Sequence, residues 1–244
     1  MQPISCLDLT FSTPEENVAC DEALLEEAEA SGSPGVLRFW ESDRHFVVLG
    51  YANRAAEEVD LDACRARGVP VLRRCSGGGT VLLGPGCLNY SLVLPIDAAP
   101  PLAVISGANR FILERHCNAI GAATGLSITM EGHTDLALGG RKFSGNAQRR
   151  KRTHFLFHGG FLLDFDLRLL ASLLRMPPRQ PEYRKGRAHA DFLTRLKTTR
   201  EVVRSALRQA WSANANVPPA AVPSKTIARL VSEKYSQAEW NYRT

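Results

Sequence analysis

Much of the chain consists of short runs in which apolar and polar residues alternate, a pattern typical of β-strands. The predicted strands are 5–11, 36–40, 46–50, 69–74, 88–94, 126–130, a hairpin at 135–148, and 153–163. Longer segments repeat their apolar residues at helical spacing, and the predicted helices are 14–31, 60–68, 104–123, 166–174, 199–213 and 225–235. Because strands outnumber helices and mostly follow one another as hairpins, we expect an α+β fold with a mixed, largely antiparallel sheet flanked by helices.

The first helix has the clearest start and stop signals. Thr13 can cap it, Pro14 suits its first turn, and Glu16 completes a capping box. Gly32 marks its end. These signals predict a helix from 14 to 31 without reference to the rest of the chain.

Length and composition limit the class of protein. The chain has 244 residues, 44% of them hydrophobic and 23% charged, which suits one large soluble domain or one domain with a small appendage. It has no run of about 18 apolar residues, so we expect no membrane association. Its first residues lack a secretory pattern. The six cysteines show no CxxC spacing, which disfavours a zinc site or a disulfide scaffold and favours the cytoplasm.

The net charge of +5 indicates an anionic partner, such as a nucleotide, an acidic protein or a nucleic acid. The densest basic patch, 149–152, is interpreted as a solvated turn between strands. No aromatic interleaving accompanies it, so we do not expect nucleic-acid binding. No long heptad pattern or apolar stripe indicates self-association, so we expect a monomer.

A glycine-rich stretch, RRCSGGGTVLLGPGCLN at 73–89, is the first candidate site. Glycines allow a ligand to approach bare backbone, and successive N–H groups can form an anion site. Arg73 and Arg74 can add charge and forked donors to the same phosphate. The three glycines alone also suit a hairpin turn beside two surface arginines.

A second stretch, GGRKFSGNAQ at 139–148, carries Lys142. Together the two motifs resemble the lipoate–protein ligase family, within the superfamily of biotin/lipoate ligases and octanoyltransferases. The segments FHGGFLLDFD at 157–166 and EKYSQAEWNY at 233–242 share this resemblance, which covers the chain from about Val36 to its end. It implies a biotin/lipoate ligase-like catalytic domain at 1–217, followed by a linker and a small C-terminal accessory segment at 218–244.

The resemblance implies a two-step reaction. ATP activates lipoate to lipoyl-AMP, and the lipoyl group then passes to a lysine of an acceptor lipoyl-domain or lipoate-binding protein. Lys142 is the expected catalytic residue, between the carboxylate and the α-phosphate. ATP and Mg²⁺ are the implied cofactors, with no metal ligands assigned. The expected ATP and lipoyl-AMP contacts are Arg74, Ser76, Gly77, Gly78, Gly79, Thr80, Val81, Leu82, Asp135, Lys142, Ala147 and His158.

Several of these residues also have purely structural interpretations. Asp135 either orients the lysine or a metal, or is an aspartate in a strand-end turn. His158 is either a wall of the site or a core histidine with both ring nitrogens bonded. Val81 and Leu82 also suit simple burial in a strand. Leu83 and Gly84 stand where the family usually has a histidine and an acidic residue.

The main alternative is an octanoyl or lipoyl transferase of the same fold, which uses a cysteine acyl-enzyme and no ATP. One class of these transferases has its thiol where this chain has Phe155, and the other has it within 118–141, which contains no cysteine. The ligase is therefore favoured, although Cys75 beside Arg74 leaves a relocated nucleophile open. The glycine- and arginine-rich loop of biotin ligases is absent. A non-catalytic scaffold would have lost the lysine or the glycines, and both are present.

The segment 176–196 is a long loop rich in proline and basic residues, and such loops are often functional. It is a candidate for closure over the site or for docking an acidic acceptor through Arg184 and Lys185. The C-terminal accessory segment is a second candidate for closure.

Overall fold

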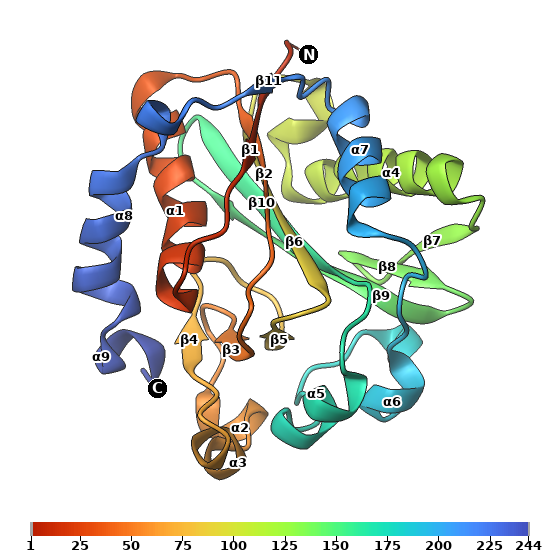
Figure 1. Cartoon of the computed structure of the whole chain (residues 1–244). Helices are drawn as coiled ribbons and strands as arrows, with labels where there is room; N and C mark the ends of the chain where they lie inside the picture. The colour runs from red at the N-terminus through yellow and green to blue at the C-terminus, as the bar shows by residue number, and fades with distance from the viewer. Residues whose placement is uncertain (1, 244) are drawn as a thin grey trace.

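The computed structural model describes residues 2–243 and is built on an eight-stranded sheet (Figure 1). Across the sheet the strands are β11 (Ala215–Asn216), β1 (Ser5–Asp8), β2 (Val36–Trp40), β6 (Cys87–Pro95), β10 (His154–Leu162), β9 (Arg141–Arg150), β8 (Asp135–Leu138) and β7 (Ile128–Glu131). Neighbours from β2 to β7 are antiparallel, whereas β1 is parallel to both β2 and β11. The predicted mixed, largely antiparallel sheet is confirmed.

A separate three-stranded sheet carries the glycine-rich loop. It contains β4 (Val71–Arg73), β3 (Phe46–Leu49) and β5 (Val81–Leu83), with β3 in the centre. The loop 74–80 therefore connects the two outer strands of this small sheet. Although β2 and β3 follow one another in the chain, they belong to different sheets, so the polar turn between them does not close a hairpin.

Helices cover both faces of the large sheet (Figure 1). Along β2, β6 and β10, Leu37, Leu92 and Phe157 face one hydrophobic cluster, whereas Val36 and Val93 face the other. This alternation is the expected pleat of a strand buried on both sides. The first cluster is covered by α4 (Ile105–Thr124) and α7 (Arg200–Ala210), and the second by α1 (Pro14–Ser31) and α8 (Ser224–Leu230). The shorter helices are α2 (Ala55–Glu58), α3 (Leu61–Ala66), α5 (Leu167–Leu173), α6 (His189–Phe192) and α9 (Ala238–Asn241).

Helix α1 begins and ends as its sequence predicts. The Thr13 side chain accepts a hydrogen bond from the backbone of Glu16, whose carboxylate accepts one from the backbone of Thr13. Gly32 ends the helix in the left-handed conformation, with φ of 68°. The capping box therefore fixes the start of the helix that carries Asp21 to the sheet.

The C-terminal segment packs behind the glycine-rich loop. The buried guanidinium of Arg73 donates hydrogen bonds to the carbonyl oxygens of Trp240 (2.9 Å) and Asn241 (3.1 Å), and Trp240 Nε1 donates to the Arg73 carbonyl at 2.8 Å. A cavity of about 690 Å³ borders the glycine-rich loop, and among the residues that the structure describes none from 218 onwards lines it. In this structure the segment therefore holds β4 rather than covering the site. The division at 217/218 stays a prediction, because Ile227 lies in the same hydrophobic cluster as α1.

Within residues 2–243, no helix combines the length and the apolar character needed to cross a membrane.

Candidate functional site

A cavity of about 690 Å³ lies between the glycine-rich loop, the strands β8 to β10 and the segment 174–193. Its volume is in the usual range for small-molecule sites. Most of the residues predicted from sequence line it: Arg74, Gly78, Gly79, Thr80, Val81, Leu82, Asp135, Lys142, Ala147 and His158. Ser76 and Gly77 belong to the same loop but do not line the cavity. The structure thus brings the two sequence motifs together around one space.

Arg74 is almost fully buried and its donors hold the glycine-rich loop. Nη2 donates to the carbonyl oxygens of Gly77 (2.6 Å) and Gly79 (2.8 Å), Nε donates to Ser76 Oγ (3.0 Å), and Nη1 lies 3.3 Å from the Val48 carbonyl. Burial lowers the pKa of Arg74 to about 10, so the side chain remains a cation near neutral pH. The Arg74 side chain lines the cavity, but most of its hydrogen-bond donors are already bonded to acceptors within the loop. Direct phosphate contact by Arg74 stays a prediction.

Lys142 projects into the cavity from the start of β9. Its Nζ lies 2.8 Å from Asp135 Oδ1, and the Tyr183 hydroxyl donates to Asp135 Oδ2 at 2.7 Å. Burial raises the pKa of Tyr183, with a further contribution from the Asp135 carboxylate, so this phenol stays a donor. The Asp135 side chain has 10% of its surface exposed and that of Lys142 has 24%. Of the two interpretations of Asp135, the contact supports orientation of the lysine.

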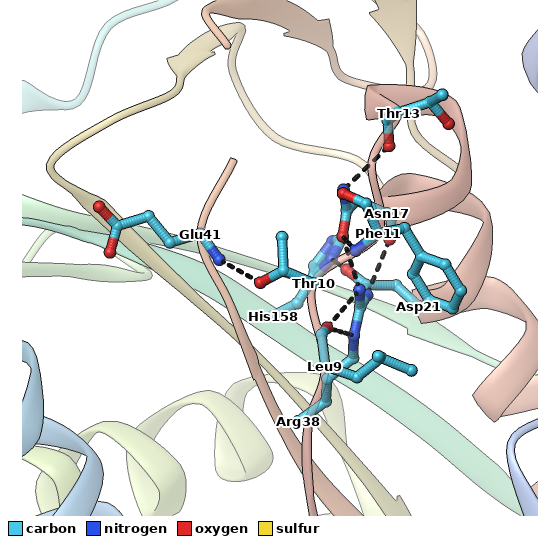
Figure 2. Close-up of polar contacts among 9 residues, drawn as sticks. All are labelled: Leu9, Thr10, Phe11, Thr13, Asn17, Asp21, Arg38, Glu41 and His158. Atoms are coloured by element: carbon cyan, nitrogen blue, oxygen red, sulfur yellow. Dashed lines mark hydrogen bonds and ion pairs between the residues drawn. The ribbon is translucent and has the colours of Figure 1, made fainter. Parts of the chain in front are cut away.

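His158 links the glycine-rich loop to helix α1 by a buried polar chain. Its Nε2 lies 2.6 Å from Ser76 Oγ and its Nδ1 lies 3.1 Å from Asp21 Oδ2. Figure 2 shows the next links, in which the Arg38 guanidinium lies between Asp21, Asn17 and the Leu9 carbonyl.

Burial would raise the pKa of Asp21, but its hydrogen bond with His158 and the Arg38 charge outweigh burial and lower it. The Asp21 carboxylate is therefore ionised and accepts hydrogen bonds. With Nδ1 of His158 donating to Asp21, its Nε2 is placed to accept a hydrogen bond from the Ser76 hydroxyl. Both sequence interpretations of this histidine hold together, because it lines the cavity and both ring nitrogens are bonded.

One part of the cavity wall is apolar. Val18, Trp40 and Val48 come from α1, β2 and β3, and Val81 and Leu82 from β5. Burial of Val81 and Leu82 in a strand is thus compatible with a place in the cavity wall. The indole Nε1 of Trp40 has no hydrogen-bond partner among the described residues. This wall suits the aliphatic part of a ligand, whereas Lys142 lies on another part of the cavity lining.

The loop segment 174–193 forms a further part of the cavity wall. The expectation that the region 176–196 closes over the site stays a prediction. The expectation that Arg184 docks an acceptor is wrong, because its side chain is buried. Arg184 Nε donates to the Arg187 carbonyl at 3.0 Å, and its guanidinium lies 4.7 Å from the centre of the Phe192 ring. Arg184 holds the segment together, whereas Lys185 is exposed.

The acidic residues at the cavity do not form a metal site of their own. Within residues 2–243, no group of three or more histidine, cysteine, aspartate or glutamate side chains could hold a metal ion. Asp21 and Asp135 already have cationic partners, and Glu58 accepts from Asn53 Nδ2 at 2.8 Å. The residues thus do not fit a preformed Mg²⁺ site.

The cysteines are poor candidates for a nucleophile. Burial raises the pKa of both Cys75 and Cys87 to about 12. Cys87 lines the cavity but is 1% exposed, and its Sγ lies 3.7 Å from Asn89 Oδ1. Cys75 lies in the hydrophobic cluster beneath α1. Neither thiol is held as a thiolate.

Two residues of the site region, Asp21 and Tyr183, were not predicted from sequence. Asp21 and Tyr183 lie far along the chain from the residues they contact, so no local pattern marks them. Arg149 is exposed, with its guanidinium 5.8 Å from the centre of the Tyr51 ring. The interpretation of 149–152 as a turn is wrong for its first two residues, because β9 continues through Arg150.

Comparisons with known proteins agree with this arrangement. The family model described as the lipoyl protein ligase A/B catalytic domain matches residues 13–211. "Lipoate-protein ligase A subunit 1" of Thermoplasma acidophilum is 28% identical, over 92% of this chain and 90% of the relative. "Octanoyltransferase LipM" of Carboxydothermus hydrogenoformans is 30% identical, over 93% and 94%.

Among solved structures, a lipoate-protein ligase A bound with ATP superposes with a TM-score of 0.82 and 26% identity, covering 99% of each chain. The relatives thus include enzymes named as ligases and enzymes named as octanoyltransferases. The family match spans most of the chain, and both motifs face one cavity: the chain belongs to the lipoyl protein ligase A/B catalytic domain family.

Proposed function

We propose that this chain is an ATP-dependent lipoate–protein ligase. It would activate lipoate to lipoyl-AMP and transfer the lipoyl group to a lysine of an acceptor lipoyl-domain protein. The observation that carries the proposal is a cavity with a lysine on one wall and an apolar surface on another, together with buried thiols of raised pKa. The relatives named as lipoate-protein ligases and the ATP-bound neighbour support the same chemistry.

In the first step, a carboxylate oxygen of lipoate forms a bond to the α-phosphorus of ATP, and the bond to pyrophosphate breaks. Two anions meet in this step, so a fixed cation is needed where negative charge accumulates. Lys142 would supply it from the cavity wall. A unit charge at 4 Å contributes about 4 kcal/mol at an effective dielectric constant near 20. Asp135 would keep the ammonium in place.

In the second step, the neutral amine of the acceptor lysine attacks the acyl carbon. The bond from that carbon to the AMP oxygen breaks, the amine loses a proton, and AMP leaves with the electron pair. Lys142 would again face the negative charge that develops on the leaving phosphate. The glycine-rich loop would contribute backbone N–H groups beside the nucleotide, with Arg74 holding its shape. Mg²⁺ would enter with the ATP phosphates.

The test is a single-turnover assay with a purified apo-lipoyl domain and lipoate, with and without ATP. We compare the wild type with Lys142→Ala and, as a matched control, with Lys225→Ala, which removes an exposed lysine outside the cavity. We expect modification and AMP release that require ATP and are lost in Lys142→Ala alone. If the wild type with ATP leaves the domain unmodified, or if Lys142→Ala modifies it at the wild-type rate, the proposal fails.

A second candidate function is octanoyl transfer without ATP, because a relative named as an octanoyltransferase is as similar as the relative named as a ligase. An octanoyl-carrier thioester replaces lipoate and ATP in a parallel assay. Transfer from this thioester that is lost on substitution of Cys75 or Cys87 would establish the second candidate. The first is excluded if lipoate with ATP also leaves the domain unmodified.

A further inference from the structure

The Asp135 carboxylate is shared between a residue of the lysine hairpin and a residue of the loop segment 174–193. Its Oδ1 lies 2.8 Å from Lys142 Nζ, and its Oδ2 accepts the Tyr183 hydroxyl at 2.7 Å. Each oxygen therefore has one partner, and the carboxylate plane is fixed by two contacts from different elements. The ammonium of Lys142, with one of its three donors used by Asp135, keeps donors for a ligand.

The segment that carries Tyr183 contacts the same hairpin at further points. Arg187 Nη2 donates to the carbonyl oxygens of Gly140 (3.1 Å) and Tyr183 (2.8 Å). The backbone N–H of Thr194 donates to the Lys142 carbonyl at 2.8 Å. The Tyr183 ring centre lies 5.1 Å from that of Phe192. The position of the phenol thus depends on how the segment lies against the hairpin.

We propose that Tyr183 is a positioning residue that makes the orientation of Lys142 depend on the seating of the segment 174–193. This inference rests on the proposed function for its kinetic consequence. With the segment in place, the phenol holds Oδ2 and leaves only Oδ1 for the lysine. Without it, the carboxylate can turn and bind the ammonium with both oxygens, which withdraws donors from the cavity. The lysine is then directed at a ligand only when the segment that lines the cavity is in place.

The first test removes the hydroxyl and keeps the ring, in Tyr183→Phe, with Tyr242→Phe as a matched control on an exposed tyrosine. Lipoyl-AMP formation is followed by pyrophosphate exchange, and folding by thermal unfolding. We expect kcat to fall about tenfold, because this factor corresponds to the free energy of one hydrogen bond to a charged group. The KM for ATP should change less than about twofold. Tyr242→Phe should match the wild type. An unchanged kcat in folded Tyr183→Phe would overturn the proposal.

A double-mutant cycle separates positioning from a general packing role. In an Asp135→Asn background no carboxylate remains to be oriented, so adding Tyr183→Phe should lower kcat less than about twofold further. If Tyr183→Phe lowers kcat equally in both backgrounds, Tyr183 does not act through Asp135 and the proposal is wrong.

The last test does not depend on the reaction. Each protein is pulsed with an amine-reactive acylating reagent at one pH, and the labelling of Lys142 is measured by mass spectrometry against that of exposed Lys225. In Tyr183→Phe, Lys142 labelling should fall about threefold because both carboxylate oxygens then hold the ammonium, with Lys225 unchanged. Equal Lys142 labelling in the two proteins would refute the coupling. An absence of lipoyl-AMP formation in the wild type would refute the proposed function, and labelling would still decide the coupling.

Discussion

Asp21 Oδ1 lies 2.7 Å from Arg38 Nη1, and the two side chains have 6% and 0% of their surface exposed. Figure 2 shows this ion pair beside His158. The polar chain continues from Asp21 through His158 to Ser76 of the glycine-rich loop. Arg38 also donates to the Leu9 carbonyl and to Asn17 Oδ1. The pair therefore joins β2, α1 and Leu9, the residue that follows β1.

Removing the charge of Arg38 should destabilise the whole protein. Arg38→Met keeps much of the side-chain volume but leaves Asp21 as a buried carboxylate without its cation, which typically costs about 3–5 kcal/mol. Urea denaturation measures the free energy of unfolding. Arg54→Met is the control, since Arg54 is 65% exposed in a surface pair with Glu57 and should leave stability unchanged. Equal stability of Arg38→Met and wild type would show that the buried pair does not hold this region.

Gly50 should tolerate no side chain, although it lies outside both sequence motifs. A Cβ at this position would overlap the carbonyl oxygen of Gly78 in the glycine-rich loop. Gly50→Ala must therefore displace the loop, and such overpacking typically costs about 1–3 kcal/mol. Gly77→Ala is the control, because a Cβ on Gly77 would meet nothing within 4 Å. Thermal unfolding without ligand should separate the two variants, and equal melting temperatures would contradict the close approach.

The sequence predicts those parts of the fold and site that depend on neighbouring residues. The Thr13–Glu16 capping box fixes the start of α1, and the hairpin pattern at 135–148 puts Lys142 at the start of β9. The resemblance to a known family additionally predicts which of these residues face the same site.

Contacts across long sequence distances could not be predicted in this way. Asp21 and His158 are 137 residues apart, and Tyr183 and Asp135 are 48 apart. A lone aspartate or tyrosine has no local signal for such a partner. The burial of Arg184 was missed for the same reason, because its place among basic residues suggested an exposed side chain whereas Phe192 and Arg187 enclose it.

Loss of the buried thiols should leave the proposed ligase activity intact. The raised pKa of Cys75 and Cys87 keeps both thiols protonated near neutral pH, so neither is a competent nucleophile. In the double variant Cys75→Ala, Cys87→Ala, ATP-dependent lipoylation should change less than about threefold, the range of a small packing adjustment. Circular dichroism checks that the variant is folded. A folded variant without acyl transfer would instead indicate a cysteine acyl-enzyme.

His116 should make stability fall as the pH is lowered. It is fully buried on α4, and Trp211 Nε1 donates to its Nε2 at 2.9 Å. Burial, with a smaller contribution from Arg115, lowers its pKa from 6.5 to about 3. The folded state thus holds the neutral ring while the unfolded state takes up a proton below pH 6.5.

The sign follows from which state binds more protons. Between pH 6.5 and about 3 the unfolded state binds more protons than the folded state. The contribution of His116 to the free energy of unfolding is therefore complete above pH 6.5. Below that pH it falls by about 1.4 kcal/mol per pH unit. Urea denaturation measures the free energy of unfolding at about pH 7 and at about pH 5. Between these pH values the wild type should lose about 2 kcal/mol more of this free energy than His116→Gln does. Exposed His133→Gln is the control and should follow the wild type. If His116→Gln loses as much stability as the wild type, His116 is protonated in the folded protein and its ring is not held neutral by the core.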